Sequence, residues 1–275
     1  LIGQNVNSYH GKIKIPSFSN QSENSNNKNP SNSSDFTNEV QNPDDVTFAE
    51  LLQLIANHLK KTNSSIKWVR FMSSHPKDLT DDVIDVIARE KVLCRHIHLP
   101  VQHGSNAILQ KMNRRYTREH YLALVEKIKS KIPEVSLTTD IMMGFPGETE
   151  QDVLDTLDLM EKVCYESAMM YFYNPREGTP AAKMEQLPVE VRKERLQRVI
   201  DLQLEHTHRQ MSARVGKIVQ VLVEGVSRDD KTELLGQTEQ HEKVAFKAEK
   251  SCIGHFVNVK LTELSGNTFR GELWS

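Results

Sequence analysis

The run Gly144-Phe145-Pro146-Gly147-Glu148 is the strongest chemical signal in the sequence. It separates an apolar stretch from a segment with helical periodicity. Gly144 and Gly147 would let the backbone approach a ligand closely, and the start of a helix offers free N–H groups. Glu148 would lie in the first helical turn, where a carboxylate also has a purely structural use opposite the helix dipole. The run therefore predicts either a ligand-binding loop or an ordinary helix start.

Other polar side chains also follow apolar stretches. Ser74 and His75 end one stretch, and Gln102 and Ser105 flank a later turn, where Ser105 could equally cap a helix. Asp140 lies inside an apolar stretch, where a carboxylate needs a partner or a ligand. The sequence contains no catalytic-triad motif, no P-loop and no GxGxxG. Polar candidates without an obvious nucleophile predict a site that borrows its chemistry from a cofactor.

Alternating strand and helix patterns would position these side chains. The expected strands are Leu1–Tyr9, Ile66–Met72, His96–Val101, Val135–Met143 and Ala168–Tyr173, with helices at about Val46–Lys61, Asp81–Glu90 (capped by Thr80), from Ser105, from Thr117 and at Thr149–Val163. A repeat of roughly 30–40 residues per helix and strand indicates a parallel sheet or barrel. In α/β barrels ligands bind at the carboxyl ends of the strands, where the polar candidates stand. Met142, Met143, Met169 and Met170 are interpreted as core residues.

The last third of the chain changes character. A long amphipathic helix is expected from Pro188 to about Arg214, with Arg192, Lys193, Arg195 and Arg198 on its polar face. Short strands then follow at Lys217–Val223, Val244–Phe246, Phe256–Leu261 and Thr268–Leu273. About five short strands in roughly 60 residues indicate a small barrel of OB-like size.

Composition limits the classes of protein that fit. Lys+Arg is 35 and Asp+Glu is 37, so a strongly basic nucleic-acid coat is excluded. No apolar run is long enough for a transmembrane helix, and the first residues are no signal peptide. Three distant cysteines form no zinc or disulfide pattern, which fits a cytoplasmic location. Ser and Asn fill 15 of the 26 positions in 17–42, which predicts a disordered, dispensable insertion.

Five ordered motifs resemble the radical S-adenosylmethionine methylthiotransferases. They are Leu1–Tyr9 (LIGQNVNSY), Ser74–Asp78 (SHPKD), His98–Ser105 (HLPVQHGS), Lys111–Arg114 (KMNR) and Asp140–Glu148 (DIMMGFPGE). The terminal β segment resembles the TRAM RNA-binding domain of that family. Within the family, the first two motifs resemble members that act on N6-dimethylallyladenosine in tRNA. Members that act on ribosomal protein or on threonylcarbamoyladenosine differ at both places.

The resemblance implies a fold and a reaction. The fold is a partial (β/α)6 TIM-like barrel without its first strand over residues 1–211, followed by an all-β OB-like TRAM domain over 212–275. The full-length protein would transfer a methylthio group to C2 of an isopentenylated adenosine next to the tRNA anticodon. S-adenosylmethionine and two [4Fe–4S] clusters are the implied cofactors, with an unknown reductant as electron donor. A monomer without membrane contact is expected.

The resemblance also implies which residues contact the cofactor. Gly3, Gln4 and Asn5 match the strand that meets its methionine end, and Ser74 and His75 lie near cofactor or substrate. Gln102 and Ser105 match the next strand-end loop. The motif around ribose and adenine supplies Asp140, Gly144, Pro146, Gly147 and Glu148.

Two departures from the family pattern limit these expectations. The CxxxCxxC loop that holds a cluster should precede Leu1, and Cys94, Cys164 and Cys252 do not match it. The chain is therefore expected to begin inside a larger protein and to be inactive alone. Residues 212–275 hold nine Lys/Arg and nine Asp/Glu, and Gln237 and Glu239 stand where basic residues are expected, so RNA binding should be weakened.

Two alternatives stay open. The protein could be a methylthiotransferase for threonylcarbamoyladenosine in tRNA or for ribosomal protein. It could also be a non-catalytic tRNA-binding remnant.

Overall fold

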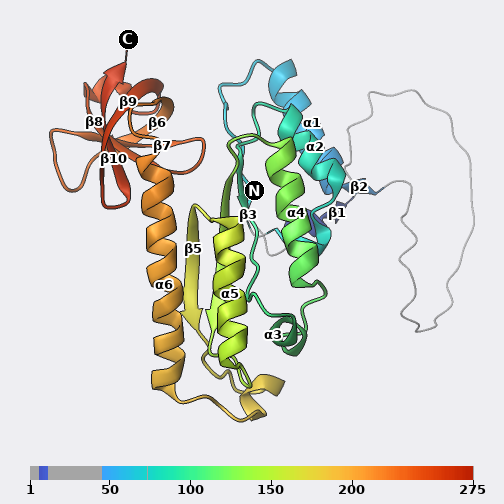
Figure 1. The fold of residues 1–275 in the computed structure, drawn as a ribbon. Helices are drawn as coiled ribbons and strands as arrows, with labels where there is room; N and C mark the ends of the chain where they lie inside the picture. The colour runs from blue at the N-terminus through green and yellow to red at the C-terminus, as the bar shows by residue number, and fades with distance from the viewer. Residues whose placement is uncertain (1–5, 12–44, 73, 275) are drawn as a thin grey trace, which may run out of the picture.

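The computed structural model describes residues 6–11, 45–72 and 74–274 (Figure 1). The predicted cofactor contacts Gly3, Gln4 and Asn5 and the predicted insertion at 17–42 lie outside the described residues. Within the described residues no helix is long and apolar enough to cross a membrane.

A three-stranded parallel sheet forms the centre of the first region. Strand β4 (Ser136–Met143) lies between β3 (His96–His98) and β5 (Ser167–Phe172). The register pairs Thr138 with His98 on one side and Asp140 with Met169 on the other. Helices connect the strands, as parallel pairing requires. The predicted α/β class is therefore confirmed.

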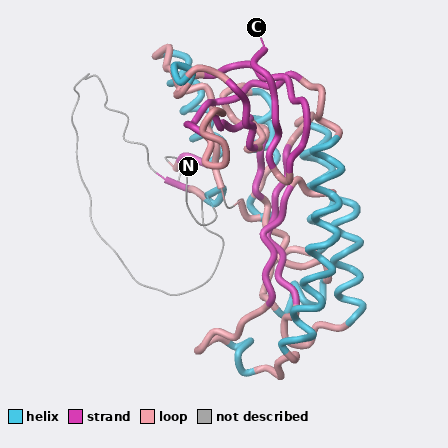
Figure 2. The backbone as a smooth tube through the Cα atoms, turned by 90° about the vertical axis from the view of Figure 1, so that its left-hand side faces the viewer, coloured by secondary structure: helices cyan, strands magenta, loops and turns pink. Residues whose placement is uncertain are grey.

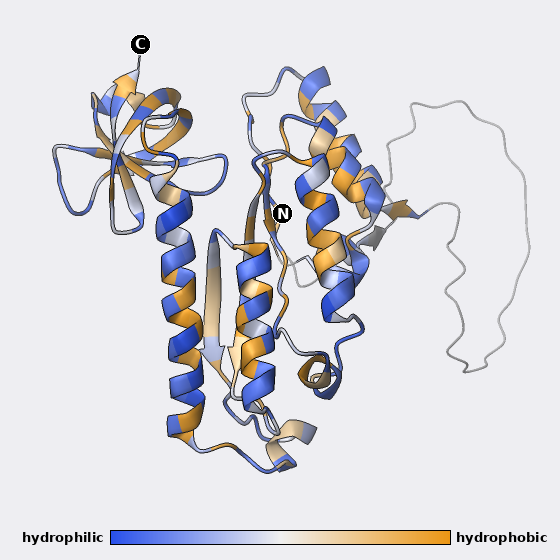
Figure 3. Cartoon of the chain, viewed as in Figure 1, coloured by the Kyte–Doolittle hydropathy of each residue, from blue (hydrophilic) through white to orange (hydrophobic). Residues whose placement is uncertain are grey.

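Helices cover one face of this sheet and bury it. They are α1 (Phe48–Lys61), α2 (Asp81–Arg89), α4 (Arg118–Lys131), α5 (Glu150–Val163) and α6 (Val189–Ser212). Helix α3 (Asn106–Lys111) lies beyond the carboxyl ends of the strands (Figure 1), where Ile108 packs with Phe145 and Tyr173. In the turned view the long helices run along one side of the strands (Figure 2), and their apolar stripes converge on one core (Figure 3). Thr47 and Thr149 each form a capping box. The predicted N-cap Thr117 is confirmed, and Thr80 occupies the predicted N-cap position of α2 without a side-chain hydrogen bond.

Two predicted strands differ from the structure in the residues that it describes. Val6–Ser8 forms a turn of 3-10 helix, so the strand expected through Tyr9 is wrong over these residues. The side chain of Asn7 replaces a strand ladder there: its Nδ2 donates to the His75 carbonyl at 2.9 Å, and the His75 N–H donates to its Oδ1 at 2.8 Å. The segment expected as a strand at Ile66–Met72 is extended, but it pairs with its neighbour only through a bridge between Val69 and Leu93.

The C-terminal region is a closed five-stranded barrel, as predicted. Its strands are β6 (Ile218–Val226), β7 (Leu234–Thr238), β8 (Lys243–Lys247), β9 (Phe256–Ser265) and β10 (Thr268–Trp274), in the order β10-β8-β7-β6-β9. The sequence pattern missed β7. A Cβ at Gly236 would collide with the Leu222 carbonyl oxygen, so β7 needs glycine where it pairs with β6. Because glycine is uncommon inside strands, this residue made β7 hard to recognise from the sequence.

The barrel packs against the amino-terminal end of the sheet, beside the end of α6 (Figure 1). Trp68 meets Phe256 edge to face, with ring centroids 4.7 Å apart. Arg70 donates to the carbonyls of Thr238 and Glu239. Glu239 Oε1 accepts the Arg95 N–H at 2.9 Å. The acidic residue that stands where a basic one was expected therefore holds the two regions together.

Candidate functional site

The sheet face opposite the helices carries a polar group among exposed apolar side chains. Asp140 Oδ1 lies 3.4 Å from His98 Nε2, and His98 Nδ1 lies 3.0 Å from the hydroxyl of Thr138. Met169 and Tyr171 on β5 share this face and are 57% and 52% exposed. The prediction of Met169 as a core residue is wrong, because strand alternation turns it away from the helices. The carboxylate of Asp140 is therefore held by His98 through Oδ1 and is partly exposed on this face.

Gln102 stands where the sheet changes its pairing. Pro100 interrupts β3, and the Thr139 hydroxyl bridges the gap by donating to the Leu99 carbonyl and accepting the Val101 N–H. Gln102 then resumes the pairing with β4 at a φ of 68°, a left-handed conformation costly for a side chain other than glycine. Its amide side chain makes no hydrogen bond to the described residues. It remains available to a ligand at this edge.

Ser74 provides a second available polar group. Its N–H donates to the His98 carbonyl at 3.2 Å, which places it beside the end of β3. The side chain is buried, and its hydroxyl has no hydrogen-bond partner among the described residues. A buried hydroxyl without a partner costs roughly 1–3 kcal/mol, so a polar ligand atom here would be stabilising.

Glu148 lies in a buried network instead. Its Oε2 accepts the Gly144 N–H at 2.7 Å and lies 3.0 Å from His103 Nε2, while Arg195 donates to Oε1 at 3.0 Å. His103 Nδ1 accepts the Ser105 N–H, so its Nε2 carries the proton towards Glu148. Glu148 thus closes the glycine loop onto α6.

The two glycines of that loop also contact protein. Both have positive φ, and a Cβ on Gly144 would collide with the side chain of Arg192. The carbonyl of Gly147 accepts a hydrogen bond from Lys111 at 2.9 Å, and Pro146 is buried. The buried hydroxyl of Ser105 donates to Asp152. In this arrangement these predicted contacts serve the loop's own structure. The predicted residues that keep unused polar atoms are Gln102 and Asp140, which are partly exposed, and Ser74, which is buried.

Sequence reasoning missed several residues that build the site. Arg192 and Arg195 were expected on the polar face of their helix, but both are buried, and Arg192 donates to the Tyr173 carbonyl at 2.5 Å. A signal existed: buried positions recur at three- and four-residue spacing along α6, at Arg192, Arg195, Val199, Gln203 and His206. His98 had no signal, because its role depends on Asp140 in the next strand.

The donor set here fits a nucleoside-like ligand and not an iron–sulfur cluster. A carboxylate, an amide and a hydroxyl suit hydroxyl and amino groups. A cluster requires several neighbouring thiolates. Cys94, Cys164 and Cys252 are free, and burial raises the pKa of the Cys94 thiol to about 11. No group of three potential metal ligands occurs within 6–11, 45–72 and 74–274.

Comparison with known proteins matches both regions. The radical SAM superfamily matches residues 41–160, and the TRAM domain matches residues 212–274. Proteins named tRNA-2-methylthio-N(6)-dimethylallyladenosine synthase are similar over 99% of this chain: 48% identical in Treponema denticola, 47% in Treponema pallidum subsp. pallidum and 44% in Lachnoclostridium phytofermentans. The matches cover 55%, 54% and 53% of those proteins, so the chain spans about half the length of these relatives.

Proposed function

Because this chain belongs to the radical S-adenosylmethionine methylthiotransferase family, we propose that its full-length protein modifies tRNA. The reaction is transfer of a methylthio group to C2 of N6-dimethylallyladenosine next to the anticodon. The observation that carries the proposal is the 48% identity to a relative with that name, which extends through both regions of this chain.

The open edge of the sheet is the cofactor end of the proposed site. When bound, S-adenosylmethionine with a reduced iron–sulfur cluster supplies radical chemistry at an unreactive C–H bond. Asp140 accepts hydrogen bonds from hydroxyl groups of the cofactor, and His98 holds its carboxylate. Ser74 and Gln102 offer their unused polar groups. Met169 and Tyr171 exclude water from the same face.

The residues of the buried network position this edge. Glu148, His103 and Arg195 tie the glycine loop to α6 and to the turn after β3. They are positioning residues, since their polar atoms already have protein partners.

The cluster ligands are proposed to lie in the part of the full-length protein outside this chain. The cysteines here do not suit a cluster, and the relatives are about twice as long. Two clusters are proposed, one for the cofactor and one for the sulfur. The barrel from residue 212 onward is proposed to bind the tRNA, and the electron donor is left unspecified.

The test uses the full-length protein in a bacterial strain that lacks its own enzyme of this kind. Nucleosides from digested tRNA are analysed by mass spectrometry, and 2-methylthio-N6-dimethylallyladenosine is expected. Methylthio groups on threonylcarbamoyladenosine or on ribosomal protein instead would replace the substrate assignment. Binding of tRNA without any methylthio product, together with an upstream coding sequence that lacks CxxxCxxC, would favour a non-catalytic remnant.

A further inference from the structure

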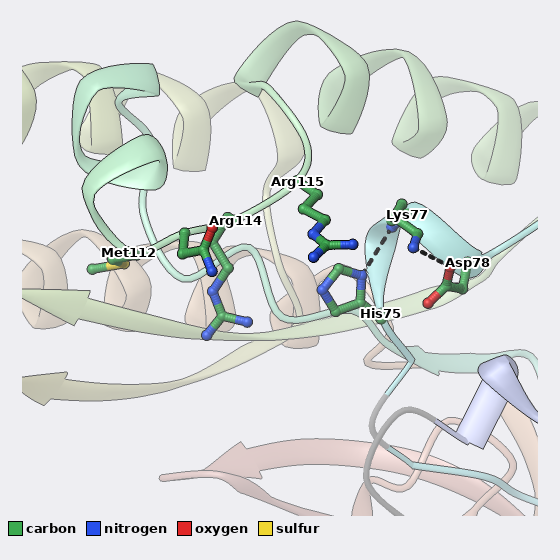
Figure 4. Close-up of a pocket in the computed structure, with 7 residues that line it drawn as sticks. His75, Lys77, Asp78, Met112, Arg114 and Arg115 are labelled. Carbon is green, nitrogen blue, oxygen red and sulfur yellow. Dashed lines mark hydrogen bonds and ion pairs between the residues drawn. The ribbon is translucent and has the colours of Figure 1, made fainter. Parts of the chain in front are cut away.

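A cavity at the carboxyl edge of the core has a lining that suits an anion. We propose that it binds a backbone phosphate of the substrate RNA, an inference that rests on the proposed function. The cavity has a volume of about 270 Å³. Its lining is His75, Lys77, Asp78, Met112, Asn113, Arg114 and Arg115 (Figure 4).

One wall is built by the end of α3. Asn113 has a φ of 56°, its N–H donates to the Gln110 carbonyl, and the Arg114 N–H donates to the Leu109 carbonyl. These two bonds form a Schellman motif, which stops the helix and turns the chain sharply. The turn brings Arg114 and Arg115 to the cavity, with the Arg115 side chain directed towards His75 (Figure 4).

The other wall is the turn Pro76–Asp78, which is held in place by hydrogen bonds with Val6–Ser8. Asn7 pairs with the backbone of His75, and the Ser8 hydroxyl donates to Asp78 at 2.6 Å. His75 Nδ1 accepts the Lys77 N–H, so a neutral ring carries its proton on Nε2 as a donor. Burial lowers the pKa of His75, which favours this neutral form.

The cations of the cavity are not neutralised within it. Arg114 and Arg115 have no carboxylate within ion-pairing distance among the described residues, and the Nε atom of Arg114 is buried without a hydrogen-bond partner. Asp78 is the one acidic residue of the lining, and it lies 3.5 Å from Lys77 Nζ. Two guanidinium groups therefore face a single cavity whose one carboxylate pairs with Lys77, and a bound phosphate would stabilise this arrangement.

A phosphate of RNA suits this cavity better than a small free anion. Lys77 and Arg115 are exposed, so the cavity is open to a large polyanion. The C-terminal barrel has as many acidic as basic residues, and the whole chain has a formal net charge of −2. Affinity for RNA depends on concentrated positive charge, and this cavity supplies it at the same edge as the proposed cofactor end.

The test measures binding of a synthetic anticodon stem-loop RNA to the full-length protein at several salt concentrations. Arg114→Gln and Arg115→Gln are each expected to weaken binding about five- to tenfold and to reduce the slope of log K against log salt by about 0.7–0.9. Arg114→Lys, which keeps the charge, is expected to keep the slope. Lys61→Gln removes an exposed cation at the end of α1 and is the matched control, with no change expected.

Several results would overturn the proposal. Unchanged RNA affinity in both glutamine variants is one, provided their unfolding midpoints match the unsubstituted protein. Reduced affinity for S-adenosylmethionine with unchanged RNA affinity is another, because the cavity would then hold the cofactor carboxylate. If the unsubstituted protein binds the stem-loop but makes no methylthioadenosine, only the proposed function would be refuted. The cavity would remain supported if both glutamine variants still weakened binding.

Discussion

The α/β core and the C-terminal barrel solve the burial of polar groups in different ways. The core buries charged and polar side chains between its sheet and α6, among them His103, Glu148, Asp152, Arg192 and Arg195. The barrel has an apolar interior of Val, Leu and Phe, and its closed ladder satisfies the backbone. The barrel therefore depends mainly on alternation of apolar and polar residues along its strands. The core depends on specific pairs of charged and polar side chains that neutralise one another in the interior.

The two regions also leave different surfaces open. The core leaves one sheet face and a cationic cavity uncovered at its carboxyl edge. The barrel has no free strand edge, and Glu239 is used against the core. Under the proposed function, the open face of the core would bind the cofactor and the closed barrel would bind RNA.

The largest effect is expected from breaking the buried network of the core. Glu148→Ala removes the buried carboxylate that pairs with Arg195 and His103 and should cost about 3–5 kcal/mol in the free energy of unfolding. Urea unfolding of the full-length protein measures this cost. Glu150→Ala, which removes an exposed ion pair with Arg198, is the control and should cost less than about 1 kcal/mol. Equal losses of unfolding free energy in the two variants would show that the buried network of the core is no more important than an exposed ion pair.

Deleting the barrel is expected to separate tRNA binding from cleavage of the cofactor. The full-length protein without residues 212–275 should bind tRNA roughly tenfold more weakly or worse, because phosphate contacts are lost. Reductive cleavage of S-adenosylmethionine in the same preparation should persist, since the proposed cofactor edge belongs to the core. Unchanged tRNA affinity after the deletion would refute the role of the barrel.

The contact between the regions should respond to pH. Burial raises the pKa of Glu166 to about 7, against the opposing charge of Arg214, which also pairs with Glu242 at 2.6 Å. The folded state therefore keeps a proton that the unfolded state releases near pH 4.5. Stability should fall between about pH 4.5 and 7, by at most about 1.4 kcal/mol per unit, and level off above pH 7.

Two variants isolate that effect. Glu166→Gln should flatten the pH dependence of the unfolding free energy, and Glu126→Gln, which removes an exposed acid from α4, should leave it as it is. A Glu166→Gln protein with the original slope would show that another group titrates.

The smallest effect concerns Glu239 at the same contact. Glu239→Lys restores the cation that the family resemblance leads one to expect. It should cost about 1 kcal/mol, because the Arg95 N–H loses its acceptor, and should not raise RNA affinity. Gln237→Lys, two residues away on β7, is the matched control for added charge. Stronger RNA binding in the Glu239→Lys protein alone would place the RNA surface at this contact.

Local features were predictable because they depend on neighbouring residues. The N-caps Thr80 and Thr117 and the apolar spacing of the helices identified most elements of the core. The motifs from Leu1 to Glu148 identified the family, which is confirmed by the relatives at 44–48% identity. β7 was missed because its glycine is required by close pairing with β6, and no local sequence pattern reveals that contact.

The sequence by itself therefore determined the order of elements, their apolar faces and the family of the chain. Only the tertiary structure decided which polar residues point inward and which stay available. Arg195 and Glu148 are 47 positions apart, and each is an ordinary surface residue until the other neutralises it in the interior. Asp140 and Met169 face the open side because β5 pairs beside β4 in one register. Periodicity shows which side of a helix or strand a residue lies on. The residues packed against that side decide whether it belongs to the apolar core, to a buried polar network or to an open site.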